Sequence, residues 1–477
     1  MPPTTTNPAG SINRITKEIA NIKRAPDLSL AVACRDDDVR HIRGLIVGPS
    51  ETPYEFGFYE FAIRFPKNYP IEPPSVRCIT TNNGRTRFNP NIYAEGKVCL
   101  SILGTWRGEA GEQWSSAQGL ESVLLSIQSL MSSNPYENEP GFEHHKITHG
   151  DAAEYARKIR HENLNISVIQ RLEKALGIDN TKPEDPTEEE DEAARKNSQE
   201  LETLLADSET PATEPSIYEY DAEASYNSLD PTPWDPFADF AKRRFLWYYD
   251  SYMRTIETSS KEQKDGRLFA ITRFEGPSNQ MEGSYQYLNL RARMDRIRRA
   301  LAAEREEWKK AGEKQVKDST GLATQLLFQF DQLKYKWNES TYSGCKMELS
   351  LLDKKNPFAW HLTIFGEPST NLDGGVFNLS LTIPPDFPES WPRVYVETPI
   401  FHHRVSSTGA LCYFPAKPDE IGSHLSAIVE AIEDKRPMHD PRAFINPEAA
   451  ELFWGGDDKR KIYNRKLMRS AQDSSEF

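Results

Sequence analysis

Two distant stretches of this 477-residue chain repeat the same order of helix, strand and turn signals. The segment GPSETPYEFGFYEFAIRFPKNYPIEPPSV (48–76) is echoed by GEPSTNLDGGVFNLSLTIPPDFPESWPRV (366–394). In both segments, apolar runs alternate with clusters of Gly, Pro, Ser, Asn and Asp, which is typical of short strands joined by turns. The copies lie much farther apart than the ~20 to 50 residues of a solenoid period. The sequence therefore predicts two copies of one fold.

The first copy begins and ends with helical periodicity. Ile12, Ile15, Ile19 and Ile22 are spaced three or four residues apart, as on one face of an amphipathic helix. Apolar residues have strand-like or helical patterns in six further segments: 28–35, 41–48, 56–65 and 75–81 for strands, and 116–130 and about 151–176 for helices. Residues 11–176 are therefore expected to form an α+β domain, a four-stranded antiparallel meander with flanking helices.

The remaining sequence divides by composition. Residues 177–235 contain EDPTEEEDE and SETPATEPS, an acidic, proline-bearing composition that buries little apolar surface and repels itself, so we expect a disordered linker. Residues 236–312 return to aromatic and amphipathic patterns and are expected to be helical. Residues 320–474 hold the second copy. The expected organisation is two α+β domains, joined by the acidic linker and the helical region.

Charge and cysteine usage exclude several classes of function. The net charge of −14 argues against general affinity for nucleic acid or for anionic lipid. No apolar run reaches the ~18 to 20 residues needed to cross a bilayer, and the start lacks the pattern of a signal peptide, so we expect a cytoplasmic or nuclear protein without a membrane partner. The five cysteines are odd in number and lack CxxC spacing, which disfavours disulfides and a metal site.

One turn-rich stretch places Cys99 eight positions after Asn91, in the order FNPNI (88–92) and GKVCL (96–100). This block resembles the active-site signature of ubiquitin-conjugating (UBC) enzymes, and YPIEPP, Trp114-Ser115 and the crossover helix follow the family's order. The phrases GKVCLSILGTW and SIQSLMSSNPYENEPGFE resemble the long Z-type branch of the family. The resemblance implies the UBC fold for both copies, the second of them degenerate.

The resemblance also implies an activity. Cys99 would accept ubiquitin, or a ubiquitin-like protein, from an activating enzyme as a thioester and pass it to substrate lysines, usually with a ligase. A thiolate suits this chemistry because it attacks an activated carboxyl group readily and later leaves readily. Asn91 is either a hydrogen-bond donor to the oxyanion that forms during transfer or a tie that holds the loop. The chain itself would need no cofactor.

Two other functions were considered. A non-catalytic scaffold of paired domains that binds ubiquitin or ligases is the main alternative, and the pairing of Asn91 with Cys99 argues against it. A cysteine protease would need a paired base, and the signature contains no histidine.

The family's partner-binding positions carry over residue by residue. Glu139 is the candidate acid at the active-site gate, although a solvated loop charge is an equal alternative. Ordinary packing or solvation is the alternative reading for the remaining positions, which are Ile71, Ser116 and Ala117 for ligases, Leu125 and Ser129 for donor ubiquitin, and Arg14 and Lys17 for the activating enzyme.

In the second copy, Cys412 matches Cys99, but Arg404 stands eight residues before it in place of an asparagine. Glu389 occupies the position of Ile71, and a counterpart of Trp114-Ser115 is missing. Cys412 is therefore either a second chargeable thiol or part of a domain kept for binding or support. The remaining cysteines lie in strand-like runs and are expected to be small buried hydrophobes: Cys34, Cys78 and Cys345.

Overall fold

The structure is a computed structural model, and it describes residues 8–24, 28–36, 38–108, 111–147, 150–178, 234–275, 281–339, 347–353, 355–433 and 437–476. Two four-stranded antiparallel sheets are present, each with its strands in sequence order. The strands of the first sheet are β1 (Leu30–Arg35), β2 (Asp38–Val47), β3 (Phe58–Arg64) and β4 (Ser75–Cys78). Those of the second are β5 (Met347–Leu351), β6 (Ala359–Phe365), β7 (Val376–Thr382) and β8 (Arg393–Val396). The predicted α+β meander is thus confirmed for the first copy, and a second sheet of the same order exists.

The part of the chain around the first sheet, residues 8–172, is called the N-terminal region below. Helix α1 (Pro8–Arg24) packs against β1 and β2 through Ile15, Ile19 and Ile22, which are buried as their spacing predicts. Ile12 was expected on the same stripe but is 40% exposed. Ser11, four residues before Ile15, is buried instead, so Ile12 lies at the edge of the buried face of α1.

The other helices of this region are α2 (Leu120–Ser129), α3 (Gly150–Glu162) and α4 (Arg171–Leu176), with short turns η1 (Ser101–Leu103) and η2 (Pro135–Asn138). Helix α2 begins at Leu120, four residues later than the pattern predicted, so Ser116 lies in the loop before α2.

The predicted helix over 151–176 is interrupted by a π-helical segment, η3 (Asn163–Gln170). Asn163 explains the local geometry, because its side-chain oxygen accepts hydrogen bonds from Tyr59 and Ser167 while its amide donates to the Glu55 carbonyl. Gly57 makes this approach possible, since a Cβ there would lie 1.8 Å from the Asn163 oxygen. The widened turn thereby attaches α3 and α4 to the β2–β3 connection.

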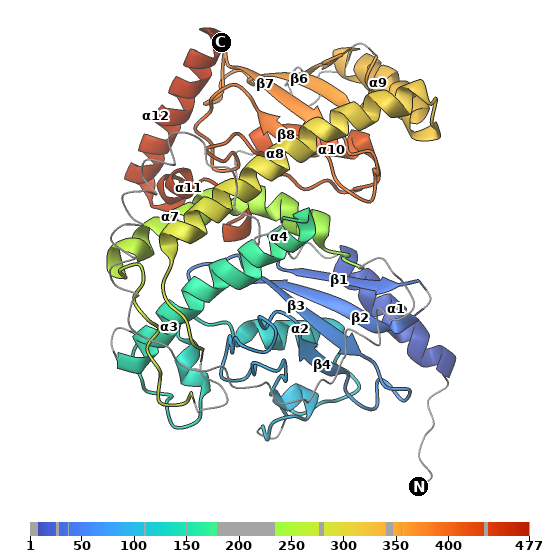
Figure 1. Ribbon diagram of the computed structural model, residues 1–477. Coiled ribbons are helices and arrows are strands. Elements are labelled where there is room, and N and C mark those ends of the chain that lie inside the picture. The colour runs from blue at the N-terminus through green and yellow to red at the C-terminus, as the bar shows by residue number, and fades with distance from the viewer. Residues whose placement is uncertain are drawn as a thin grey trace, which may run out of the picture. The chain divides into compact units, whose positions relative to one another are not determined.

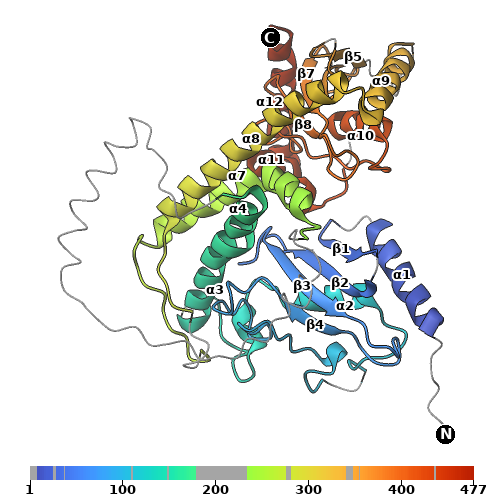
Figure 2. The same ribbon diagram turned by 45° about the vertical axis from the view of Figure 1, so that its right-hand side comes forward.

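The predicted helical region after the linker contains α7 (Ala238–Glu262) and α8 (Tyr287–Lys317). They lie side by side in Figures 1 and 2. The aromatic residues that marked this stretch in the sequence are buried along α7, among them Phe245, Trp247, Tyr248 and Tyr252.

The part around the second sheet, residues 321–476, is called the C-terminal region. Its helices are α9 (Gly321–Glu339), α10 (Ile421–Glu433), α11 (Pro447–Trp454) and α12 (Asp457–Asp473), with short turns η4 (Pro441–Ala443) and η5 (Ser474–Glu476). Buried residues of the sheet, α9, α10, α11 and α12 form one apolar core, at whose centre Trp360 is fully buried.

By compactness the chain divides into Met1–Leu172 with Pro236–Phe477 as one unit and Glu173–Asp235 as the other. The predicted linker falls almost entirely, and Cys345 entirely, outside the described residues. Of the remaining predicted core cysteines, Cys78 is buried as expected and Cys34 is partly exposed. Among the helices that the structure describes, none combines the length and hydropathy of a bilayer span.

Candidate active site

Cys99 lies in a turn-rich segment, residues 88–105, that we call the Cys99 loop. The Cys99 amide donates to the Asn91 carbonyl at 2.8 Å, and the Asn91 side-chain amide donates to the Cys99 carbonyl at 2.9 Å. These reciprocal bonds close the eight-residue interval that the sequence singled out. In this structure, therefore, the Asn91 amide is engaged in holding the backbone of Cys99.

Further bonds support the two ends of the loop. The Gly96 carbonyl accepts from the Cys78 amide, which attaches the loop to β4. Gly96 has a φ of +93°, and a Cβ there would meet the Cys78 oxygen at 2.4 Å, so this turn requires glycine. After the cysteine, Thr105 accepts from the Leu100 amide and donates to the Val98 carbonyl. Cys99 is thus held by backbone and hydroxyl contacts on both sides.

Cys99 is nearly buried. The residue retains 5% of its accessible surface, which is less than is usual for a reactive thiol in a loop. The hydrogen bonds just described hold the backbone on both sides of this nearly buried residue.

Two residues that the sequence analysis did not assign support the loop, Tyr54 from outside it and Asn89 from within it. Tyr54 donates a hydrogen bond to the Phe88 carbonyl at 2.7 Å and accepts one from the Asn89 side chain at 3.0 Å. Asn89 in turn accepts from the Asn91 backbone amide at 2.9 Å. Both residues are fully buried.

Glu139 lies just after η2 and reaches the Cys99 loop through Arg87. The Arg87 guanidinium contacts the Glu139 carboxylate at 3.5 Å and donates to the Pro90 carbonyl at 2.6 Å. Burial raises the pKa of Glu139, and the charge of Arg87 opposes that rise. The carboxylate is therefore brought toward the residue that precedes Asn91, and Arg87 is a second residue that the sequence did not mark.

The positions predicted to face ligases are brought together by one indole. Trp114 donates from its ring nitrogen to the Pro70 carbonyl at 2.9 Å, so the turn of Ile71 and the loop of Ser116 and Ala117 are connected. Ile71 is 47% exposed, and Ser116 and Ala117 are exposed as well. The result is an accessible apolar side chain beside an accessible loop.

The positions predicted to face donor ubiquitin share a face of α2. Leu125 and Ser129 are four residues apart, which places them one above the other on a helix, and both are exposed. The predicted face for the activating enzyme is divided: Lys17 is exposed, whereas Arg14 is engaged with Glu18 and donates to the Gln118 carbonyl at 3.0 Å. Arg14 thus also ties α1 to the loop before α2.

The corresponding segment of the C-terminal region, residues 401–414, is called the Cys412 loop. Its backbone repeats the first pattern, because the Cys412 amide donates to the Arg404 carbonyl at 2.9 Å and the Arg404 amide donates to the ring of His402 at 3.1 Å. Cys412 itself has no exposed surface. Burial raises the pKa of Cys412 to about 11, although the nearby Arg404 and Arg244 act in the opposite direction.

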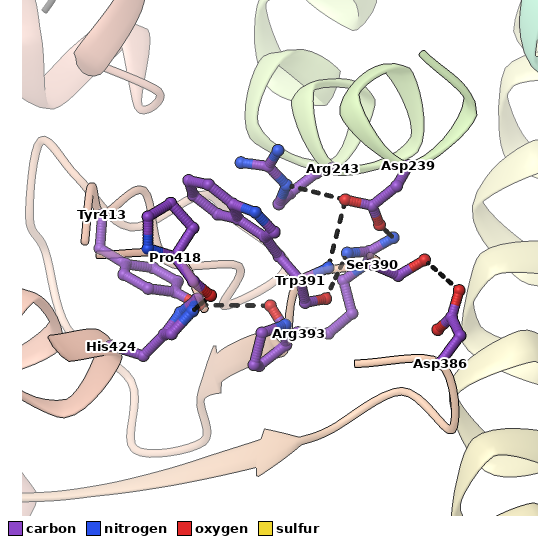
Figure 3. A network of polar contacts seen from close by, with 10 residues as sticks. Asp239, Arg243, Asp386, Ser390, Trp391, Arg393, Tyr413, Pro418 and His424 are labelled. Atoms are coloured by element: carbon purple, nitrogen blue, oxygen red, sulfur yellow. Dashed lines mark hydrogen bonds and ion pairs between the residues drawn. The ribbon is translucent and has the colours of Figure 1, made fainter. Parts of the chain in front are cut away.

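The sequence predicted that the C-terminal region lacks a counterpart of Trp114-Ser115, and the structure shows what supports the turn instead. Trp391 lies edge-on to His424 at 5.5 Å between ring centroids, and the Tyr413 hydroxyl lies 3.0 Å from the His424 ring nitrogen (Figure 3). Tyr413 also donates to the Pro392 carbonyl at 3.3 Å. Three aromatic side chains therefore replace one tryptophan.

A metal centre finds no support in the parts of the chain that the structure describes, where no group of three or more His, Cys, Asp or Glu side chains is arranged to hold an ion. His402 and His403 are stacked on each other and buried. Burial lowers the pKa of His402 to about 3. These histidines are neutral core residues of the C-terminal region.

Comparisons with known proteins agree with this geometry. The family model "Ubiquitin-conjugating enzyme" matches residues 14–162 and 330–416. "Ubiquitin-conjugating enzyme E2 Z" of Xenopus tropicalis is 51% identical over 160 residues, covering 34% of this chain and 50% of that protein. The human protein of the same name is 50% identical over 160 residues, covering 34% of this chain and 44% of that protein. The match thus spans about half the length of these relatives.

A solved ubiquitin-conjugating enzyme domain of Toxoplasma gondii is 28% identical and covers 32% of this chain and 97% of its own, with a TM-score of 0.27. The sequence matches to the family model and to the two E2 Z proteins coincide with the α+β region that holds the Cys99 loop. Through this N-terminal region, the chain is similar in sequence to ubiquitin-conjugating enzymes.

Proposed function

We propose that the chain is a ubiquitin-conjugating enzyme that carries ubiquitin, or a ubiquitin-like protein, as a thioester on Cys99. The observation that carries this proposal is the closed pair formed by Asn91 and Cys99, within a region that matches the family. The relatives are named as ubiquitin-conjugating enzymes, and an intact cysteine with its asparagine is what their reaction would require.

The reaction would run in two acyl transfers at one atom. In the first, the Cys99 sulfur forms a bond to the carbonyl carbon of ubiquitin's activated terminus, and the group that held ubiquitin on the activating enzyme leaves with the electron pair. In the second, a substrate amine adds to the thioester carbon, loses a proton, and expels the Cys99 thiolate. Negative charge on the carbonyl oxygen would be stabilised by a nearby donor.

Asn91 fits both roles considered for it. Its side-chain nitrogen carries two N–H groups, one of which serves the Cys99 carbonyl and leaves the other to serve an oxyanion. The hydrogen bond in the structure supports the loop-holding role directly. Glu139, whose pKa is raised by burial, is the proposed acceptor for the proton of the incoming amine.

The partner surfaces follow from exposure. Ile71, with Ser116 and Ala117, offers an apolar anchor beside a loop, which suits a ligase. A donor ubiquitin would rest on Leu125 and Ser129 of α2. Lys17 supplies positive charge for an acidic surface of the activating enzyme, and Arg14 would contribute only if it left Glu18. The cytoplasm or nucleus remains the predicted location.

For the C-terminal region we propose a degenerate UBC fold that serves binding or support. Its sheet order, its match to the family model and the bonds of the Cys412 loop support the fold. The complete burial of Cys412 and the arginine at position 404 favour support over a second catalytic thiol.

A charging assay tests these proposals. The full chain would be incubated with ATP, ubiquitin and a panel of activating enzymes, and adducts would be separated with and without reducing agent. We expect a reducible adduct in the unaltered chain and in Cys412→Ala, and none in Cys99→Ala. An adduct that survives in Cys99→Ala and disappears in the double variant would assign carriage to Cys412. Absence of any adduct across a panel of modifiers would favour the scaffold alternative.

A further inference from the structure

We propose that α7 positions the Cys99 loop, with Tyr248 and Tyr252 as positioning residues, so that the C-terminal region supports the geometry of Cys99 through this helix. The inference rests on the proposed function only for its effect on ubiquitin transfer. Its effect on the reactivity of the Cys99 thiol stands without that function.

The first contact joins α7 to the connection between β2 and β3. The ring of Tyr248 is stacked on that of Phe56, with centroids 4.1 Å apart and planes 9° apart. One helical turn later, the Tyr252 hydroxyl donates to the Phe56 carbonyl at 2.8 Å. All three residues are buried. Phe56 has a φ of +53°, a conformation that a bulky residue adopts only where its surroundings impose it.

A short hydrogen-bonded route runs from Phe56 to Cys99. The next residue, Gly57, donates its amide to the Tyr54 carbonyl at 3.0 Å, which fixes the turn containing Phe56 against Tyr54. The Tyr54 hydroxyl then meets the Asn89 side chain at 3.0 Å, and Asn89 accepts from the Asn91 amide. The Asn91 side chain completes the route at the Cys99 carbonyl.

Helix α7 is also anchored to the C-terminal region. The Tyr248 hydroxyl donates to the Arg442 carbonyl at 3.0 Å. Nearer the start of the helix, Asp239 forms an ion pair with Arg393 at 2.7 Å, and the Arg243 guanidinium lies 3.7 Å from the centre of the Trp391 ring (Figure 3). The helix is therefore held at several points and at more than one of its turns.

The hydrogen bonds on the route from α7 to the Cys99 loop are buried, and this makes them costly to break. A buried hydrogen bond cannot be replaced by water, so losing one hydroxyl leaves its partner unsatisfied or forces the chain to shift. Shifting the turn of Phe56 displaces Tyr54, and with it the asparagine that orients Asn91. A loosened Cys99 loop would expose its thiol more, because Cys99 is only 5% exposed while the loop is held. The same loosening would misalign the thioester for transfer.

Three single-hydroxyl variants of the full chain test the inference. Tyr252→Phe removes the bond to Phe56, and Tyr248→Phe removes the bond to Arg442 but keeps the stacked ring. The matched control is Tyr249→Phe, because Tyr249 lies between them on α7 and its hydroxyl bonds to Asp295 of α8. For each variant, alkylation of Cys99 by iodoacetamide would be followed against pH by peptide mass mapping, alongside the thermal midpoint. Discharge of the preformed thioester to free lysine would be the second measurement.

We expect Tyr252→Phe to raise the alkylation rate of Cys99 at least threefold and to lower the discharge rate at least threefold. Tyr248→Phe should change the alkylation rate and the discharge rate in the same directions but by smaller factors. Tyr249→Phe should change neither rate, even if it lowers the thermal midpoint as much as Tyr252→Phe does. In a chain that already carries Asn89→Ala, Tyr252→Phe should change the two rates by less than it does in the unaltered chain.

Equal alkylation rates in Tyr252→Phe and Tyr249→Phe would overturn the inference, as would simple additivity with Asn89→Ala. If the chain forms no thioester at all, the proposed function fails, and the alkylation rates still decide whether α7 positions the loop.

Discussion

The Cys99 loop and the Cys412 loop follow one backbone plan and differ in what their side chains face. In both, the cysteine amide bonds to the carbonyl of the residue eight positions earlier, and that residue's amide bonds to a side chain two positions before it. In the Cys99 loop, the residue eight positions before the cysteine is Asn91, whose side-chain amide also donates a hydrogen bond to the Cys99 carbonyl. In the Cys412 loop it is Arg404, which cannot supply the same short amide donor from that position.

The surroundings differ as well. Turns beside the Cys99 loop present Ile71 and the Ser116 loop to solvent. In the equivalent turn beside the Cys412 loop, Glu389 is also exposed, but Arg243 of α7 covers the ring of Trp391. Trp247 of α7 also contacts Phe414 of the Cys412 loop, with ring centroids 5.5 Å apart. Helix α7 thus packs on the Cys412 loop and on part of its neighbouring turn.

The largest expected difference is in thiol reactivity. The pKa of about 11 leaves about one Cys412 thiol in a thousand ionised near pH 8, and the residue has no exposed surface. We therefore expect Cys99 to react with a maleimide or disulfide reagent at least a hundred times faster than Cys412, as measured by mass mapping of each peptide. Comparable rates at the two cysteines in the native chain would break the comparison.

The next largest effect concerns the anchor of α7. Asp239→Asn removes the charge that pairs with Arg393, whose side chain is only 5% exposed. Breaking a buried pair commonly costs about 3 to 5 kcal/mol, and we expect about 3 kcal/mol because Asp239 keeps 17% exposure. Denaturant unfolding would measure the loss, and Cys412 should become easier to label. The matched control, Asp250→Asn, alters a more exposed contact to Ser407 and should cost much less.

Replacement of the residue eight positions before each cysteine separates the two loops. Asn91→Ala removes the bond to the Cys99 carbonyl, and loss of an oxyanion donor costs about 10² to 10³ in rate, so thioester discharge should fall by up to that factor. Arg404→Ala should leave both charging and discharge of Cys99 unchanged. A discharge rate that responds to Arg404→Ala as strongly as to Asn91→Ala would mean that the Cys412 loop participates in transfer.

The smallest effect is a dependence of stability on pH. Burial lowers the pKa of His402 from 6.5 to about 3 and that of His424 to about 4. The unfolded chain therefore binds protons below about pH 6.5 that the folded chain refuses, so stability is full above that pH and is lost as pH falls toward 3. His402→Asn, which copies Asn89, should reduce the acid-induced drop in the thermal midpoint. An unchanged pH profile would contradict this account of His402.

The predictions made from the sequence held best where the relevant contacts are local. Ile15, Ile19 and Ile22 are buried as their spacing indicated, because helical periodicity depends on neighbours three and four residues away. Cys99 and Asn91 meet because a tightly turned segment of this length can adopt only a few conformations. The late start of α2 was missed, since the end of a helix depends on the rest of the fold as well as on periodicity. Ile12 was missed because the buried face of α1 includes Ser11 in its place.

Contacts between distant segments could not be foreseen in the same way. Nothing near Tyr54 indicates that its hydroxyl meets Asn89, and nothing near Arg87 indicates its contact with Glu139. The burial of Cys412 likewise depends on packing around its loop that no local pattern records. Each of these contacts joins segments that are separated by tens of residues or more, so their partners are chosen by packing and not by local propensity.

From its residues alone, the chain could be assigned an α+β fold, a second region with the same order of strands, and one cysteine that stands out by its motif. These features follow from hydrophobic periodicity and from short spacings between residues, both of which depend on only a few neighbouring residues. The tertiary structure decided how far Cys99 is buried, which side chains hold Asn91, and why the two cysteines differ so strongly. It did so because α7, far from both loops in sequence, packs beside the Cys412 loop and bonds to the turn behind Cys99.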